Sequence, residues 1–181
     1  MCHICNTKPV YEFTNKRKLC KNCFIKWFEK KALYTARKFN MLNKGDFVCY
    51  KKSSDFRDVV LENTLKMFAE KGRIKLTKGR KYDKFAIPVT INLTAYEFAD
   101  KIINKSVKNM NEFLPKNKKI IKPLYFFLDE EVLLYVQLKK LKFKKIKEKK
   151  KDKISQFINE LEKKHPEVKR AVVSSYLKLY C

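Results

Sequence analysis

Two Cys-x-x-Cys pairs close to the first residue constrain this chain more than any other feature. Cys2 and Cys5 form the first pair, and Cys20 and Cys23 form the second after fourteen intervening residues. Each pair can bring two thiolates to one ion, and the loop between them lets the pairs meet. Four soft thiolates favour Zn²⁺ over hard cations. We therefore expect residues 1–30 to form a zinc knuckle. Closed four-cysteine sites are normally structural, so we expect no catalytic role.

Other uses of four cysteines stay open at this point. An iron–sulfur cluster also takes four cysteines, but usually through other spacings. Paired spacing disfavours four isolated buried thiols, and six cysteines with four in metal-type pairs fit a reducing compartment better than two disulfides. No apolar leader follows Met1, and no apolar run has the length of a membrane helix. These observations predict a cytoplasmic protein without membrane contact.

The charge is strongly positive and predicts a polyanionic partner. Lys and Arg number 44 against 19 Asp and Glu, for a net charge of +25. Nucleic acid is the first expectation for such a balance. An AT-rich genome would produce the same lysine-rich, glycine-poor bias, so a solvated lysine surface remains an alternative. The candidate phosphate contacts lie on the first helix (Lys26, Lys30, Arg37 and Lys38) and in the densest lysine run, residues 139–153 (Lys139, Lys140, Lys144, Lys145, Lys149 and Lys150).

Hydrophobic spacing after the knuckle predicts an α/β domain. Residues 23–42 carry an aromatic stripe at helical spacing, and residues 47–50 form a short apolar strand. Asp55 can cap a helix that runs to about Lys71 and stops at Gly72. This strand–loop–helix unit is the element that binds phosphate in many α/β proteins.

The rest of the chain continues the alternation. A second strand is expected over 85–91, demoted toward a sheet edge by Pro88. Thr94 or Asn92 can cap a helix to about Met110. Further expected elements are an extended stretch at 125–128, a helix capped by Asp129, and helices at 154–164 and 168–180. We therefore divide the chain into the knuckle (1–30), a small α/β domain (31–138), and a basic run with C-terminal helices (139–181).

Several of these pieces together resemble one family. Leu19-Cys20-x-x-Cys23-Phe24 with the helix after it resembles the N-terminal zinc finger of the TtuA-like tRNA thiolases. These are PP-loop ATP pyrophosphatases that place sulfur on uridine, related to the cytosolic complex that thiolates wobble uridine. Residues 121–124 (Ile-Lys-Pro-Leu) and the Asp129-x-Glu131 segment are similar to the "KPL…E-x-E" region of the family. The resemblance implies a small, truncated PP-loop-like (Rossmann-like) domain with a helical C-terminus.

The departures from the family concern its chemistry. The nucleotide loop of the family is S-G-G-x-D-S, and the corresponding positions here are a degenerate loop of Lys51, Lys52, Ser53, Ser54 and Asp55. Both glycines, and the close backbone approach to phosphate that they permit, are lost. The chain has 3 glycines in all, so the loop is not displaced elsewhere. The catalytic or cluster-binding cysteines of the family have no counterpart, and ATP is not expected as a cofactor.

The resemblance therefore predicts a non-catalytic relative of the tRNA 2-thiolation enzymes. Such a protein would bind tRNA, or scaffold a catalytic PP-loop paralogue or a homodimer, during wobble-uridine modification. A zinc-containing, ribosome-associated RNA-binding protein is the alternative. An active ATP-dependent tRNA thiolase ranks third, because no phosphate loop and no nucleophilic cysteine pair is visible.

Overall fold

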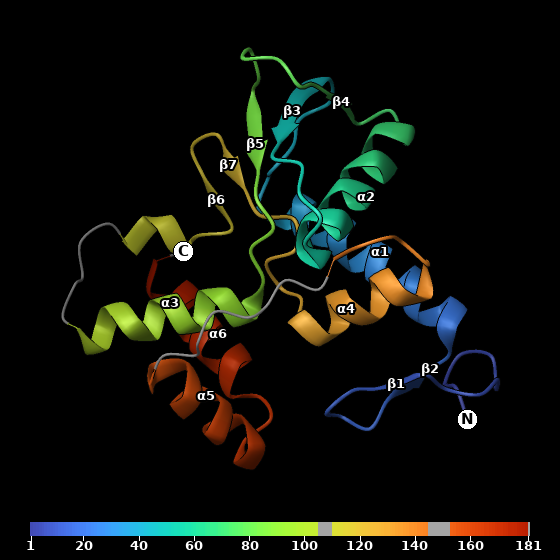
Figure 1. The fold of residues 1–181 in the computed structure, drawn as a ribbon, viewed down its shortest axis with the longest axis vertical. Coiled ribbons are helices and arrows are strands. Elements are labelled where there is room, and N and C mark those ends of the chain that lie inside the picture. Colours follow the sequence, from blue (N-terminus) through green and yellow to red (C-terminus); the bar gives the residue numbers. More distant parts are fainter. Residues whose placement is uncertain (105–109, 145–152, 181) are drawn as a thin grey trace.

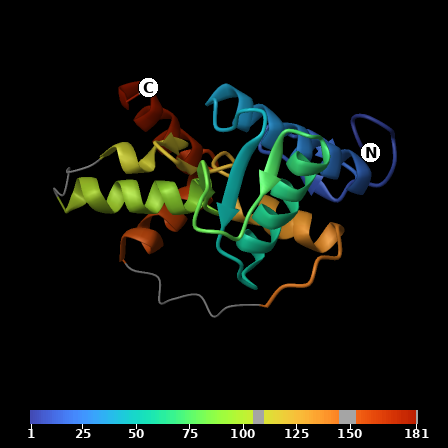
Figure 2. The same ribbon diagram turned by 90° about the horizontal axis from the view of Figure 1, so that it is seen from above.

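The computed structural model describes residues 1–104, 110–144 and 153–180. Three of the candidate phosphate contacts, Lys145, Lys149 and Lys150, lie outside these ranges. Figures 1 and 2 both place the cysteine-rich hairpin beside helices α1 (Lys21–Lys38) and α4 (Asp129–Leu138). Helices α3 (Ile91–Ile103), α5 (Lys153–Lys164) and α6 (Val168–Tyr180) form a second helical group. None of the helices in the described ranges has both the length and the apolar composition needed to cross a bilayer.

The N-terminal segment is a hairpin followed by the longest helix among the described residues. Strands β1 (Tyr11–Glu12) and β2 (Lys18–Leu19) pair antiparallel, and α1 spans Lys21–Lys38. The helix stops four residues before the predicted end. Asn40 has a φ of 45°, and the amide of Met41 donates to the carbonyl of Ala36 at 2.9 Å, which closes the last turn.

A five-stranded sheet forms the centre of the domain (Figure 1). Its order is β4-β3-β5-β7-β6, with parallel pairing except between the last two strands. The strands span Asp46–Tyr50 (β3), Ile74–Leu76 (β4), Lys84–Ala86 (β5), Lys116–Asn117 (β6) and Ile120–Ile121 (β7). Helix α2 (Phe56–Glu70) connects β3 to β4. The α/β fold class is thus confirmed, and residues 51–55 lie between β3 and α2.

The expectation that Pro88 places its strand at a sheet edge is wrong. Strand β5 lies in the middle of the sheet, between β3 and β7. It ends at Ala86, and the next amide, that of Ile87, still donates to the carbonyl of Ile121 at 3.0 Å. Pro88 lies beyond the last ladder hydrogen bond, so its missing N–H removes no pairing.

Two helix starts also differ from expectation. Helix α3 (Ile91–Ile103) begins after Thr90, so Asn92 lies inside its first turn and not at the cap position. The side chain of Asn92 accepts a hydrogen bond from the amide of Asp129 at 3.0 Å and does not cap α3. Helix α4 (Asp129–Leu138) has Leu128 at its N-cap position. The backbone amide of Leu128 donates to the carboxylate of Glu131 at 2.9 Å.

The expectations for the segments before α4 and after α3 are also wrong. Residues 125–128 were expected to be extended, but the chain turns tightly there, with hydrogen bonds from Tyr125 N to Lys122 O and from Phe127 N to Leu124 O. The helix expected to reach Met110 stops at Ile103, and Met110 opens a 3-10 turn, η1 (Met110–Phe113). Helices α5 (Lys153–Lys164) and α6 (Val168–Tyr180) form as predicted.

Aromatic packing joins the knuckle helix to the rest of the core. The ring of Phe28 stacks on Phe127 at 4.0 Å and on Tyr135 at 4.1 Å between centroids. Phe28 is fully buried, and Cys2 and Leu19 of the knuckle belong to the same apolar cluster. The aromatic stripe of α1 is therefore core, as its spacing predicted.

A buried carboxylate ties three helices together. Glu131 on α4 is fully buried and accepts from Lys31 Nζ of α1 at 3.3 Å and from Arg170 Nη2 of α6 at 2.9 Å. Buried charges persist only where such partners satisfy them. This contact holds the first turn of α6 against the knuckle helix.

Candidate metal centre and phosphate-binding surfaces

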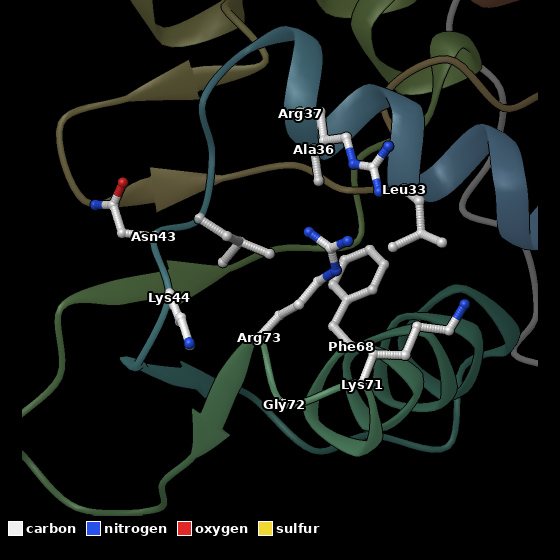
Figure 3. A pocket seen from close by; sticks show the side chains of 10 residues that line it. Leu33, Ala36, Arg37, Asn43, Lys44, Phe68, Lys71, Gly72 and Arg73 are labelled. Atoms are coloured by element: carbon white, nitrogen blue, oxygen red, sulfur yellow. The ribbon is translucent and has the colours of Figure 1, made fainter.

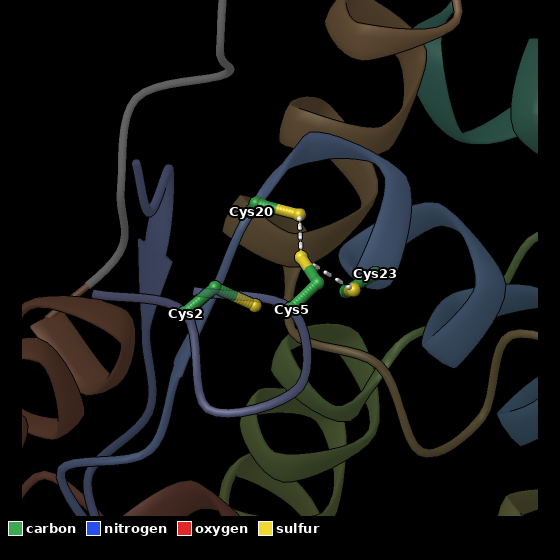
Figure 4. Close-up of side chains that lie close together, drawn as sticks. All are labelled: Cys2, Cys5, Cys20 and Cys23. Atoms are coloured by element: carbon green, nitrogen blue, oxygen red, sulfur yellow. Dashed lines mark hydrogen bonds between the residues drawn. The ribbon is translucent and has the colours of Figure 1, made fainter. Parts of the chain in front are cut away.

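The four knuckle thiols converge on one point (Figure 4). Every pair of their ligand atoms lies within 4.8 Å, with 3.4 Å from Cys5 Sγ to Cys20 Sγ and 3.5 Å from Cys23 Sγ to Cys5 Sγ. These separations exceed the roughly 2 Å bond of a disulfide, and the thiols are unlinked. Cys2, Cys20 and Cys23 are buried, and Cys5 is exposed.

Sulfurs at this spacing fit one ion better than a cluster. Tetrahedral bonds of about 2.3 Å place four sulfurs about 3.8 Å apart around Zn²⁺. In a cubane cluster each thiolate binds a different iron, so the sulfurs must stand farther apart than those that share one ion. Within residues 1–104, 110–144 and 153–180, no other three Cys, His, Asp or Glu side chains form a comparable group. The knuckle can therefore hold a metal ion, and it does not fit a 4Fe-4S cluster in this arrangement.

The thiols have different acidities when no cation is bound. Hydrogen bonds lower the pKa of Cys20 to about 6, and the bond with the side chain of Thr7 makes the largest contribution. Burial raises the pKa of Cys23 to about 12. A bound cation favours the thiolate form of all four, so binding releases protons and strengthens as the pH rises.

The hairpin between the cysteine pairs packs on the single tryptophan. The ring of Phe13 lies edge-on to Trp27 at 4.7 Å, and Trp27 also contacts Phe24 at 5.3 Å. The amino group of Lys31 lies 4.7 Å from the centre of the Trp27 ring. Trp27 is half-buried, and its ring already packs on Phe13, Phe24 and Lys31, which argues against the stacking of a nucleic-acid base on that ring.

The degenerate loop lies where the strand–loop–helix pattern places it, after the carboxyl end of β3. Asp55 caps α2 as predicted, because its Oδ1 accepts from the amide of Arg57 at 2.9 Å. Ser53 Oγ accepts from the amide of Asp55 at 3.1 Å. Lys52, Ser53 and Ser54 line an open hollow of about 340 Å³ beside the loop. Lys51 is exposed.

The first turns of α2, α3 and α4 meet next to this loop. Arg57 Nε donates to Asp129 Oδ1 at 2.9 Å, and Thr90 Oγ1 donates to the same oxygen at 2.7 Å. Arg57 Nη2 also pairs with the second carboxylate oxygen of Asp129. An acid and a base from distant segments therefore neutralise each other where three helix N-termini converge. Sequence reasoning missed this pair because 72 residues separate its members.

The candidate phosphate contacts that the structure describes lie on two surfaces. Lys26, Lys30, Arg37 and Lys38 are all exposed on α1, and the first three fall within about 40° of one another at 100° per residue. Lys139, Lys140 and Lys144 are exposed at and beyond the end of α4, and Lys139 Nζ lies 3.4 Å from a carboxylate oxygen of Glu29. The amide of Lys144 donates to the carbonyl of Ser54 at 2.8 Å, which holds this segment beside the degenerate loop.

The structure shows a third basic surface, and Arg37 is the single member of it that the sequence analysis named as a candidate phosphate contact. A pocket of about 260 Å³ lies between α1, the turn before β3 and the end of α2 (Figure 3). Four cationic residues from three segments line it: Arg37, Lys44, Lys71 and Arg73. No periodicity relates these positions, so no pattern in the sequence indicates this surface.

Comparison with known proteins rests on the fold. No family model matches the sequence, and no curated protein is similar to it. The structure is similar to that of the U34-tRNA thiolase NcsA from Methanococcus maripaludis, solved with its 4Fe-4S cluster. The match covers 98% of this chain and 86% of that chain, with 20% identity and a TM-score of 0.79. The predicted resemblance is thus confirmed in architecture, and the chain has the fold of a U34-tRNA thiolase.

Proposed function

We propose that this protein is a non-catalytic, zinc-binding relative of the tRNA thiolases that binds tRNA during wobble-uridine modification. One observation carries the proposal. A fold shared with a U34-tRNA thiolase over 98% of the chain is combined with a nucleotide loop that has no glycine between Lys51 and Asp55. The protein would bind tRNA itself, or hold tRNA for a catalytic PP-loop paralogue or within a homodimer.

The contacts at the loop support the loss of ATP chemistry. A helix N-terminus attracts phosphate when its amides are free and its positive end is unopposed. Here the carboxylate of Asp55 accepts from Arg57 N, and the guanidinium of Arg57 binds Asp129. A phosphate approaching α2 would meet a carboxylate and no glycine backbone. We therefore expect ATP to bind weakly or not at all.

Zinc is the metal we propose for the knuckle. Sulfur separations of 3.4 Å and 3.5 Å suit bonds to one tetrahedral ion, and four thiolates select a soft or borderline cation. The cysteines would hold the ion without an open coordination position. Its role would be to hold the hairpin on α1, as structural zinc does in small domains.

The positive charge of the chain supports a polyanionic partner, and α1 offers the simplest surface for it. Lys26 and Lys30 are exposed on α1, next to Arg37 and Lys38. Phosphate contacts release counterions, so the logarithm of the affinity should fall linearly with the logarithm of the salt concentration. Lys139, Lys140 and Lys144 form the second proposed contact, with Lys145, Lys149 and Lys150 following them in the chain.

The decisive test is binding of unthiolated tRNA to the whole protein by fluorescence anisotropy across a salt series. Replacing Lys26 and Lys30 with alanine should weaken binding and reduce the salt slope by about 2. A matched variant, Lys8→Ala with Lys16→Ala, removes the same charge and should change binding less. Absence of tRNA binding at moderate salt would reject the proposal.

Further outcomes separate the alternatives. Co-sedimentation with ribosomal particles in place of tRNA binding would favour the ribosome-associated alternative. Release of pyrophosphate from ATP in the presence of tRNA would identify an active enzyme and overturn the non-catalytic assignment. Co-purification with an intact PP-loop protein would support the scaffold role.

A further inference from the structure

The pocket between α1 and the end of α2 lies at the opposite end of β3 from the degenerate loop. β3 runs from Asp46 to Tyr50, and the loop follows Tyr50, whereas Asn43 and Lys44 of the pocket precede Asp46. The pocket therefore belongs neither to the cysteine site nor to the loop after β3.

The floor of the pocket is apolar. Leu33 and Ala36 of α1, Leu42 of the following turn, and Phe68 of α2 line it. Phe68 is fully buried, so the floor is part of the main core and is held in place by it. A volume of about 260 Å³ is just below the range of about 300–1,000 Å³ typical of drug-sized ligands, and it suits a smaller body.

The rim of the pocket is cationic. Arg37, Lys44, Lys71 and Arg73 are all exposed, and within the part of the chain that the structure describes no ion pair joins any of them to a carboxylate. Figure 3 shows the guanidinium groups of Arg37 and Arg73 reaching from α1 and from the start of β4 over the same space. Two like charges over one cavity repel each other, and an anion between them relieves the repulsion.

Helix ends explain only part of this charge. Arg37 lies in the last turn of α1 and Lys71 at the end of α2, where cations stabilise the helix dipole. Lys44 and Arg73 lie in no helix, so the dipole does not account for them. The guanidinium groups of Arg37 and Arg73 above an apolar floor indicate a ligand that has both an anionic group and an apolar or planar body.

We propose that this pocket binds one nucleoside phosphate unit. The base and sugar would lie against Leu33, Leu42 and the edge of the floor. The phosphate would receive hydrogen bonds from Arg37 and Arg73, because the planar guanidinium group matches phosphate oxygens in pairs. The nucleotide is either a free mononucleotide or an unpaired residue of a bound RNA. The RNA source rests on the proposed function.

The test is NMR titration of the isotope-labelled whole protein with AMP, UMP and inorganic phosphate. Nucleotides should shift the backbone amides of Gly45, Gly72 and Arg73. Arg37→Ala with Arg73→Ala should weaken nucleotide binding at least about tenfold, equivalent to ~1.4 kcal/mol. A control variant, Arg80→Ala with Lys81→Ala, removes the same charge from the exposed β4–β5 loop and should weaken binding far less. Arg37→Lys with Arg73→Lys keeps the charge and should still weaken binding, because lysine lacks the planar fork of N–H donors that matches two phosphate oxygens at once.

Three results would overturn the inference. One is the absence of nucleotide-induced shifts at the pocket amides, and the second is equal loss of affinity in the pocket and control variants. The third is inorganic phosphate binding as tightly as AMP and UMP, which would leave an anion site without nucleoside recognition.

Photochemical crosslinking of bound tRNA, mapped by mass spectrometry, distinguishes the two sources. Crosslinks to peptides that contain Leu42–Lys44 or Lys71–Arg73 support the RNA source. Mononucleotide binding at the pocket without tRNA binding would reject the proposed function and support a free nucleotide. Binding of tRNA without any nucleotide contact at the pocket would reject the inference and leave the proposed function standing.

Discussion

Replacement of Glu131 with glutamine tests how the knuckle helix is held to the C-terminal helix. The carboxylate is fully buried and accepts from Lys31 at 3.3 Å, from Arg170 at 2.9 Å and from the amide of Leu128 at 2.9 Å. Glutamine has nearly the same shape and can still accept from the amide. The substitution removes the negative charge, and it also turns the oxygen that accepts from Arg170 into an NH2 group that cannot accept.

The expected loss is about 3 kcal/mol of unfolding free energy. Breaking a buried ion pair by removing one partner costs about 3–5 kcal/mol. The lower end applies because the side chains of Lys31 and Arg170 are 17% and 31% exposed, so water partly screens them. Such a loss is a large fraction of the roughly 5–15 kcal/mol by which a domain is stable.

The loss should also depend on pH. Burial lowers the pKa of Lys31 to about 8 even with the carboxylate beside it. Without Glu131 that pKa falls further, so Lys31 loses its proton at lower pH in the folded variant. Above pH 8 Lys31 is largely neutral in the wild type as well, so its pair with Glu131 is lost while the pair with Arg170 remains. The difference between the two proteins should therefore shrink as the pH rises toward 8 and level off above it.

Urea unfolding followed by fluorescence of Trp27, the single tryptophan, measures the change. The control is Glu12→Gln, which breaks the pair with Lys18 at 3.2 Å, where the side chains are 43% and 41% exposed. Exposed pairs contribute about 0–1 kcal/mol. Equal losses for Glu131→Gln and Glu12→Gln would refute the view that burial gives the Glu131 network its strength.

Three further predictions concern the metal, the pH dependence and the core. The protein should contain about one zinc per chain by metal analysis. Cys23→Ser or a chelator should remove the zinc and shift Trp27 emission to the red, because Phe13 of the knuckle packs on that ring at 4.7 Å. Unchanged emission after zinc loss would contradict this prediction. Burial lowers the pKa of Lys122 to about 8, below its value in the unfolded chain. Above pH 8 the unfolded chain therefore binds more protons than the folded one, and Lys122 should raise the free energy of unfolding by about 1 kcal/mol between pH 7 and 9. Lys122→Met should reduce that rise in urea titrations, and an equal rise in both proteins would exclude Lys122 as its source. Phe28→Ala should cost about 3–5 kcal/mol in the same assay, because it empties a fully buried aromatic stack, and a loss below about 1 kcal/mol would show that the stack contributes little.

Local features of the structure were accessible from the sequence because they depend on nearby residues. The Cys-x-x-Cys spacing anticipated the convergence of four thiols. Asp55 and Gly72 marked the ends of α2, since a cap and a left-handed glycine act on adjacent backbone groups. The glycine-free loop at 51–55 could be recognised because its position follows a strand and precedes a helix.

Other features failed because the deciding contact was distant. Pro88 suggested an edge strand, yet pairing with Ile121 puts β5 in the middle of the sheet. Asn92 looked like a helix cap, yet it bonds to Asp129, 37 residues away. Lys122 belongs to the Lys-Pro-Leu segment, and nothing in the neighbouring residues predicts that it is buried.

The cysteine pairs, the ends of α2, the apolar stripe of α1 and the lack of glycine at 51–55 all follow from the amino-acid sequence alone. These follow from backbone geometry and side-chain chemistry over a few residues. The strand order, the burial of Glu131 between Lys31 and Arg170, and the meeting of Arg37 with Arg73 over one pocket arise from the packing of distant segments. Strand pairing and the strength of a charge both depend on which of those segments exclude water from them.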